Sequence, residues 1–443
     1  MYISGHYFFA LNLSEEQILA LAPDDASRKS GRGLASPGKW VSKGANEQAI
    51  WGECQGSGAK PYQTQVDLGN LAFKCSCPSR KFPCKHGLGL LLLRCKHPQQ
   101  FTAAAAPAWV TEWLDRRAEK EGLNAAKKDK PVDEAAQAKR LQARQQKVGG
   151  GIEELRRWIK DIIRNGLLTI PEKGGAYWEN MAKRMIDAQA PGLAARVRGL
   201  GEVDFFVEGW QTRFLDRLVR LYMILQGYGR LEELPAPLQE DLKSLVGFPF
   251  AQEELNAQEG VRDDWFVLAR KTTEEEQLTV ERNWLYGWRS KRYALVLQFY
   301  VRNQVPGVSL SPGTSMDASL VFYPGAYPLR VLVKEIHNTR LAELPPGYAG
   351  WSAVAEQEAA NASIYPFADE YPYVVNALKP VFYNNEWWLQ DEENRLAAVV
   401  RNYSAIWKLL AFSGGSALPM SVIGRENEFE PLGIWYNQEY KIL

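Results

Sequence analysis

The chain has 443 residues, enough for about three domains at roughly 150 residues each, which excludes a miniprotein held together by staples. Hydrophobic residues make up 46%, charged residues 24% and aromatic residues 12%, a composition typical of globular rather than disordered protein. The net charge of +1 hides an asymmetry, because residues 1–148 carry 22 Lys and Arg against 14 Asp and Glu, whereas residues 149–443 carry 31 against 38, so a polyanion-binding surface is expected only in the N-terminal third.

The first hundred residues change in texture near residue 48. A stretch rich in Gly, Ser, Lys and Arg from Ser27 to Lys43 predicts a solvated basic loop. Three runs of β-forming residues, separated by turn signals, predict strands over Ala49–Cys54, Tyr62–Leu68 and Leu71–Cys75. After a group of cysteines, the apolar run from Gly87 to Cys95 predicts a helix.

The remaining chain divides by composition and periodicity. Residues 101–150 are rich in Ala, Lys, Gln, Glu and Arg and end in three glycines, which predicts a charged helical linker. Apolar spacings of three and four then predict helices, and after residue 260 the pattern favours strands, with a last helix over Leu396–Phe412 and no internal repeat. The predicted fold class is α+β multidomain, with an N-terminal region (1–100), the linker (101–150), a helical domain (151–250) and a C-terminal α+β domain with a mostly antiparallel sheet (261–443).

One motif carries clear chemistry. Four metal donors follow the pattern Cys-x-Cys-x6-Cys-x-His, namely Cys75, Cys77, Cys84 and His86. Three thiolates and one imidazole suit a closed, tetrahedral structural Zn²⁺ site, in which no coordination position is left for a catalytic water. Two residues spaced by two in a strand point the same way, so the first cysteine pair can face one ion. We therefore expect one structural Zn²⁺ rather than buried or redox-active cysteines.

The nearby Cys95 and His97 repeat the Cys-x-His spacing. If the intervening segment is helical, His97 lies about 16 Å along the axis from His86 and cannot reach the same ion. We interpret Cys95 as a packed thiol, His97 as a histidine at the end of a helix, and Cys54 as a core residue.

The four donors, preceded by a β-hairpin and followed by an apolar helix, resemble a SWIM zinc finger over about residues 48–97. Gly58, Pro61, Tyr62 and Val66 also resemble the hairpin of that family. The whole chain is similar to bacterial SWIM zinc-finger proteins. The resemblance implies a β-hairpin/helix zinc finger that binds DNA or proteins, and partners such as a MoxR-type AAA ATPase and a von Willebrand factor A domain protein.

Positive charge surrounds the motif. No acidic residue occurs between Asp67 and Glu112, and the residues expected to contact phosphates of DNA or RNA are Lys74, Arg80, Lys81 and Lys85. Phe73 and Phe82 are candidates for stacking on bases or, alternatively, for covering the metal. The same cations can also offset the formal charge of −1 on a Cys₃His zinc site, so a protein-interaction adaptor remains the alternative function.

Signatures of enzymes are scarce. The chain has four histidines and no phosphate-binding loop, and the carboxylates Asp263 and Asp264 with His337 are interpreted as turn and surface residues rather than a hydrolase site. Five cysteines, no secretory signal and no apolar run longer than Leu88–Leu93 predict a cytoplasmic protein outside the membrane. The sequence therefore predicts a non-enzymatic, zinc-binding protein.

Overall fold

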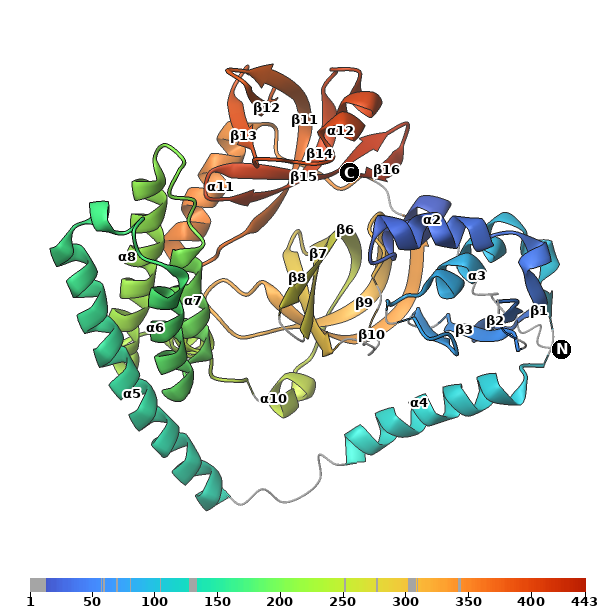
Figure 1. The fold of residues 1–443 in the computed structure, drawn as a ribbon, viewed down its shortest axis with the longest axis horizontal. Helices are drawn as coiled ribbons and strands as arrows, with labels where there is room; N and C mark the ends of the chain where they lie inside the picture. The colour runs from blue at the N-terminus through green and yellow to red at the C-terminus, as the bar shows by residue number, and fades with distance from the viewer. Residues whose placement is uncertain are drawn as a thin grey trace.

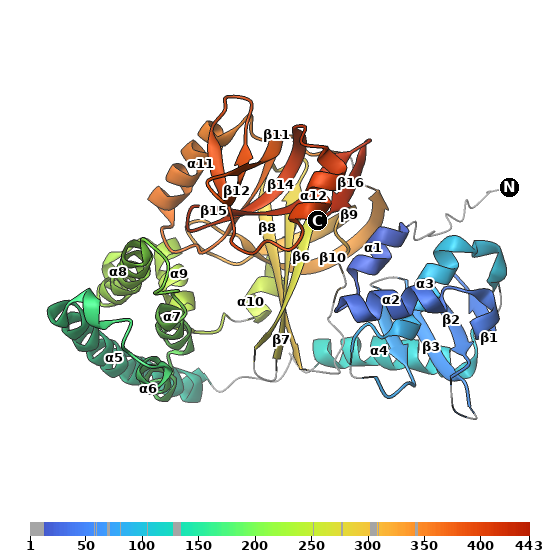
Figure 2. The same cartoon turned by 45° about the horizontal axis from the view of Figure 1, so that its top comes forward.

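The computed structural model confirms an α+β fold with three mostly antiparallel sheets and a helical region. It describes residues 13–56, 58, 60–68, 71–79, 81–103, 105–126, 134–250, 252–275, 278–301, 308, 310–341 and 344–443. The N-terminal part and the helical region lie on opposite sides of two β-structures (Figures 1 and 2). Within the described ranges, none of the helices combines the length and the hydropathy that a membrane span requires.

The N-terminal part, which we call the finger unit, is built on a five-stranded sheet. The three strands predicted from the sequence are present, and the sheet order is β4-β3-β2-β1-β5, with bounds β1 (Trp40–Ala45), β2 (Ala49–Cys54), β3 (Tyr62–Asp67), β4 (Ala72–Cys75) and β5 (Thr102–Ala103). Helix α3 (Lys85–Lys96) packs on this sheet through a leucine-rich face, and Leu88 is buried with Ile50 and Val66. This shared core fixes the helix start next to the end of β4.

The basic loop predicted over Ser27–Lys43 is wrong over its first part, because helix α2 (Asp25–Leu34) occupies it. The side chain of Asp24 caps this helix by accepting a hydrogen bond from the Ser27 amide at 2.7 Å. The helix crosses α3 closely, because a Cβ on Gly89 would lie only 2.7 Å from the Cβ of Leu34. Tertiary packing against α3 therefore favours a helix in a segment whose composition favours a loop.

Two long helices lead out of the finger unit. Helix α4 (Ala108–Ala126) buries Val110 and Trp113, and Val110 packs with Trp51 of the finger sheet. Helix α5 (Glu134–Asn165) continues through glycines 149–151, where the sequence predicts the linker to end. The glycines are accommodated because Gly151 packs closely on Ala188, where a Cβ would lie 2.5 Å from the Ala188 Cβ.

Helix α5 and the four helices after it form a bundle. Its core includes Trp178, Phe214 and Leu218, all buried, and its further helices are α6 (Gly175–Asp187), α7 (Pro191–Gly201), α8 (Trp210–Tyr228) and α9 (Ala236–Val246). The short helix α10 (Gln252–Ala257) then leads to the β-structures. The bundle is thus a separate hydrophobic core from that of the finger unit.

Five strands form the first barrel. They close in the order β10-β8-β7-β6-β9 and comprise β6 (Val261–Glu275), β7 (Leu278–Gly287), β8 (Tyr293–Val301), β9 (Thr314–Phe322) and β10 (Arg330–Leu341). The first three strands are an antiparallel meander, β9 returns to pair with β6, and β10 closes the ring by pairing antiparallel to β9 and parallel to β8. Trp265, Leu285 and Ala318 are among the residues of its core.

The second barrel repeats this connectivity. It comprises β11 (Tyr371–Tyr383), β12 (Glu386–Gln390), β13 (Leu396–Val399), β14 (Leu418–Arg425) and β15 (Glu428–Tyr436), with β16 (Glu439–Ile442) added at the edge. Strand β13 pairs antiparallel to β12 and parallel to β15, which closes a ring of five strands. Helix α11 (Trp351–Ile364) precedes the ring. The one helix predicted over Leu396–Phe412 is wrong, because β13 occupies its start and only α12 (Ile406–Ser413) is helical.

Helix α1 (Glu15–Ala20) attaches the finger unit to the first barrel. The Gln17 side chain is buried and donates a hydrogen bond to the Gly313 carbonyl at 3.1 Å, while the Ser311 hydroxyl donates to the Gln17 carbonyl at 3.0 Å. Arg270 of β6 donates to the carbonyls of Ala20 and Leu21 at 3.3 and 3.0 Å. These long-range bonds fix α1 on the barrel.

Arg270 is also part of a buried ion pair. Its guanidinium lies 2.7 Å from the carboxylate of Glu281, which is fully buried in β7. Three neutral side chains also donate to that carboxylate, namely Asn283 at 2.9 Å, Tyr300 at 3.1 Å and Gln298 at 3.4 Å. The buried charge is therefore paired and hydrogen-bonded, as burial requires.

Candidate metal centre

The four predicted donors come from three adjoining pieces of the finger unit. Cys75 is the last residue of β4, and Cys77 follows two residues later. Cys84 is the N-cap residue of α3, with extended backbone angles, and His86 lies in the first turn of that helix. Because the packing of α3 on the sheet holds its first turn beside the end of β4, the two pairs of donors face each other.

The geometry fits a tetrahedral metal ion. The donor atoms of Cys75, Cys77, Cys84 and His86 all lie within 4.8 Å of one another. Zn–S distances of about 2.3 Å and Zn–N distances of about 2.0 Å at tetrahedral angles place S and N donors about 3.6 Å apart. The His86 Nδ1 atom lies 3.7 Å from the Cys75 Sγ and 4.0 Å from the Cys84 Sγ. The donor set and its spacing therefore match what Zn²⁺ requires.

The surroundings of the cluster orient its donors. The Thr64 hydroxyl lies 3.1 Å from the Cys75 Sγ, so β3 contributes a hydrogen bond to a sulfur donor. The Tyr62 ring packs against the His86 ring with centroids 5.0 Å apart. Phe73 is 3% exposed and meets Phe82 edge to face, so Phe73 belongs to the core and is no stacking platform for bases.

The protonation of the cluster reflects crowding of the donors. Hydrogen bonds with Cys75 and Cys84 hold the pKa of the Cys77 thiol well below its usual range, whereas hydrogen bonds with Cys75 and Cys77 raise the pKa of the Cys84 thiol. Burial lowers the pKa of His86, but hydrogen bonds and negative charge from Cys75 and Cys77 outweigh it and raise that pKa to about 9. The crowded thiolates therefore need a nearby positive charge, which a bound divalent cation would supply.

The comparisons with known families agree with this geometry. Residues 62–97 match the SWIM zinc finger. The chain carries a SWIM zinc finger. Residues 143–246 match the SWIM-associated four-helix bundle domain, which covers α5 from its central part through to α9. No curated protein and no solved structure gave a significant match to the chain.

The other cysteines and histidine near the finger lie outside the cluster. His97 is the C-cap residue of α3, as predicted, and Cys54 is fully buried. Cys95, predicted to be packed, is exposed on the last turn of α3. Its thiol donates a hydrogen bond to the Leu13 carbonyl at 3.3 Å, and the neighbouring Lys96 pairs with Glu15 of α1 at 2.9 Å, so the segment around the start of α1 contacts the end of the helix.

The lysines predicted to contact nucleic acid lie in different settings. Lys74, Lys81 and Lys85 are all exposed, and Arg80 lies outside the described residues. Lys81 pairs with Asp24 at 2.6 Å, and the hydrogen bond from Lys81 lowers the pKa of that carboxyl to about 2. Lys74 and Lys85 form no salt bridge with any residue that the structure describes.

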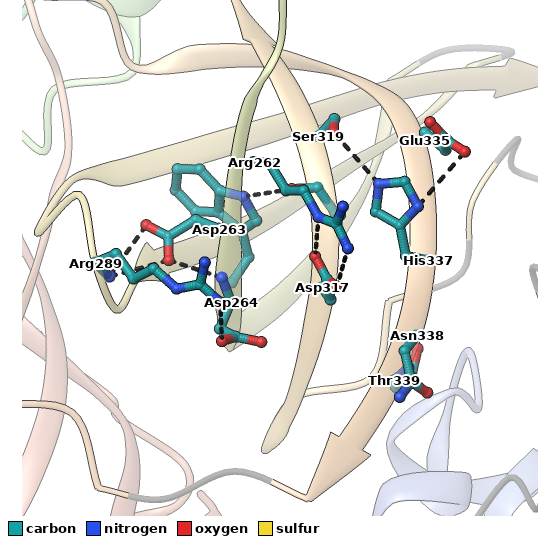
Figure 3. A network of polar contacts seen from close by, with 12 residues as sticks. Arg262, Asp263, Asp264, Arg289, Asp317, Ser319, Glu335, His337, Asn338 and Thr339 are labelled. Atoms are coloured by element: carbon teal, nitrogen blue, oxygen red, sulfur yellow. Dashed lines mark hydrogen bonds and ion pairs between the residues drawn. The ribbon is translucent and has the colours of Figure 1, made fainter.

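The carboxylates and histidine considered for hydrolase chemistry lie on the first barrel (Figure 3). Asp263 is buried and accepts hydrogen bonds from the Arg289 and Ser290 amides at 2.9 and 2.7 Å, so it holds the turn between β7 and β8. His337 lies 3.5 Å from both Ser319 and Glu335. The Glu335 side chain is 65% exposed, so this group faces solvent rather than an enclosed site.

Proposed function

We propose that this chain is a non-enzymatic protein whose SWIM zinc finger holds one structural Zn²⁺ and binds nucleic acid through Lys74 and Lys85. The observation that carries the proposal is the placement of these two lysines. Lys74 directly precedes Cys75, and Lys85 stands between Cys84 and His86, so the metal donors fix the backbone on which both lysines lie. Zinc acts by folding this surface, because binding energy at structural sites is largely folding energy.

Phosphate binding is favoured by charge. The finger unit provides exposed lysines within a chain third that carries an excess of Lys and Arg over Asp and Glu. A Cys₃His site with Zn²⁺ has a formal charge of −1, which the two lysines more than offset. Contacts of this kind bind without sequence preference and weaken steeply with salt.

The test is a binding titration. Labelled single-stranded DNA, duplex DNA and RNA are titrated with the intact chain at about 50 and about 200 mM salt, and then with the Lys74→Gln/Lys85→Gln variant. The matched control is Lys29→Gln/Lys39→Gln, which removes two exposed lysines elsewhere in the finger unit. Loss of two phosphate contacts is expected to lower the salt slope on duplex DNA by about 1.8. Equal binding by the test variant and the control would contradict the proposal.

A protein-interaction adaptor is the second candidate function, favoured by an apolar groove on the bundle. The groove, of about 320 Å³, runs between α5 and α8, and Ile163 and Val219 in its lining are each 52% exposed. The SWIM family resemblance points to a MoxR-type AAA ATPase or a von Willebrand factor A domain protein as the partner. Calorimetry with a purified partner tests this role, and Val219→Asp should abolish the heat of binding.

A further inference from the structure

The two barrels share the same strand connectivity, and barrels with this connectivity commonly bind ligands on one face. In each, three strands form a meander, the fourth pairs with the first, and the fifth closes the ring parallel to the third. In the second barrel α12 lies between the third and fourth strands. This is the connectivity of OB-fold barrels, in which the outer face of strands two and three and the loop between strands four and five bind oligonucleotides or oligosaccharides.

A cleft of about 610 Å³ lies at that face of the first barrel. We call it the central cleft. On the barrel side it is lined by Lys271 and Thr273 of β6, Arg282 and Trp284 of β7, Leu295 of β8, and the loop from Tyr323 to Arg330 between β9 and β10. It adjoins a second cleft of about 720 Å³, since both are lined by Arg196, Tyr365 and Arg425. The position of the cavity thus coincides with the face that the connectivity singles out.

The barrel wall of the central cleft combines cations with aromatic rings and bears no carboxylate in its lining. Lys271 and Arg282 are direct cross-strand neighbours on β6 and β7; the Lys271 ammonium pairs with the Glu430 carboxylate at 2.7 Å, and Arg282 donates to the Thr273 hydroxyl at 3.0 Å. Arg330 lies over the Tyr323 ring, 4.3 Å from its centroid. Trp284 is 2% exposed, and its indole N–H has no acceptor in the part of the chain that the structure describes. Such a wall can stack bases and neutralise phosphates.

The opposite wall of the central cleft is less suited to anions. It carries four carboxylates, from Glu202, Asp241, Asp369 and Glu370, together with Arg196 and Arg425. Its two ion pairs are long, with Arg196 at 3.6 Å from Asp369 and Arg425 at 3.8 Å from Glu370. These carboxylates would repel a phosphate chain, so such a chain would have to follow the barrel wall.

We propose that the central cleft is a single-stranded nucleic-acid site, separate from the zinc finger. A single strand is favoured over an oligosaccharide because the wall at the OB face presents Arg282 and Arg330 beside the Lys271–Glu430 ion pair, and neutral sugars do not need such cations. It is favoured over a duplex because the bundle residues Arg196, Glu202 and Asp241, together with the segment before β11, line the side opposite the barrel. Arg282 and Arg330 contact phosphates, and Tyr323 and Tyr327 pack against bases. The site does not depend on the function proposed for the finger.

The test uses the full chain and a labelled oligothymidylate of about 15 nucleotides, long enough for one OB fold. The Arg282→Gln/Arg330→Gln variant is compared with Arg157→Gln/Arg164→Gln, which removes two exposed arginines from α5. The cleft variant should bind at least about tenfold more weakly at low salt, with a salt slope smaller by about 1.4, whereas the control should bind like the wild type. Unchanged binding by the cleft variant overturns this proposal, even where the Lys74→Gln/Lys85→Gln variant shows that the finger binds.

A second variant keeps the test valid if the arginine variant does not fold. Asp369→Asn/Glu370→Gln removes two carboxylates from the far wall and should raise affinity for the oligothymidylate severalfold. An unchanged or lower affinity of this variant overturns the proposal. Competition by a neutral oligosaccharide but not by unlabelled oligothymidylate also overturns it, because the ligand class is then wrong.

Discussion

Replacing Arg270 with Met should loosen the attachment of the finger unit to the first barrel. The change removes the partner of a fully buried Glu281 and the donor to the carbonyls of Ala20 and Leu21. Breaking a buried ion pair costs about 3 to 5 kcal/mol, and the low end applies because Asn283, Gln298 and Tyr300 still donate to Glu281. The two carbonyls add about 1 kcal/mol, so we expect a loss of about 4 kcal/mol.

The assay is native-state hydrogen exchange, since a chain with several cores is not expected to unfold in one step. The amides of α1 and β6 should lose protection, while those of the bundle should not change. Arg270→Met/Glu281→Leu, which removes both charges, should recover most of the loss in β6. A loss of protection in α1 and β6 below about 1 kcal/mol in the single variant would refute the reasoning.

Two further predictions concern the metal site and a carboxyl group in the central cleft. Elemental analysis should find one equivalent of zinc per chain and none in the Cys84→Ser/His86→Ala variant. The control Cys95→Ser, at a residue outside the cluster, should bind zinc as the wild type does. Full zinc retention by the double variant would defeat the ligand assignment. Burial raises the pKa of Asp241 from 3.8 to about 6, so its ionisation opposes folding fully above about pH 6 and not at all below about pH 3.8. The Asp241→Asn variant keeps an acceptor for the Ala326 amide. After allowance for solvent screening, it should be more stable than the wild type by about 1 kcal/mol at pH 8 and equally stable at pH 3.5. Equal unfolding midpoints of the two proteins at pH 8 would count against this prediction.

Local patterns were sufficient for the metal site. The four donors lie within a segment of twelve residues, and each lies at the end of a strand, in a short loop or at a helix start, so their convergence follows from spacing and local structure. The strands before them also agree with the sequence, because their alternating and β-branched residues pack on α3 within the same unit.

The elements that local sequence patterns do not predict are those determined by long-range packing. Helix α2 forms because glycines permit it to cross α3 closely, a contact that no local propensity records. The run after Leu396 has helix-forming residues, yet pairing with β12 and β15 makes it a strand, and Asn402 with φ of 57° separates it from α12. The repeated barrel connectivity lies in strand pairing between distant segments, so it leaves no repeat in the amino-acid sequence.

The bonds of α1 to the first barrel have a consequence for ligands longer than either site. Gln17 and Arg270 bond α1 to the first barrel, so we expect the distance between Lys74 and the central cleft to stay nearly constant. When two sites lie at a fixed distance, a ligand shorter than that distance cannot engage both of them at once. If the finger and the central cleft both bind single strands as proposed, affinity should rise abruptly at the oligonucleotide length that first reaches both sites.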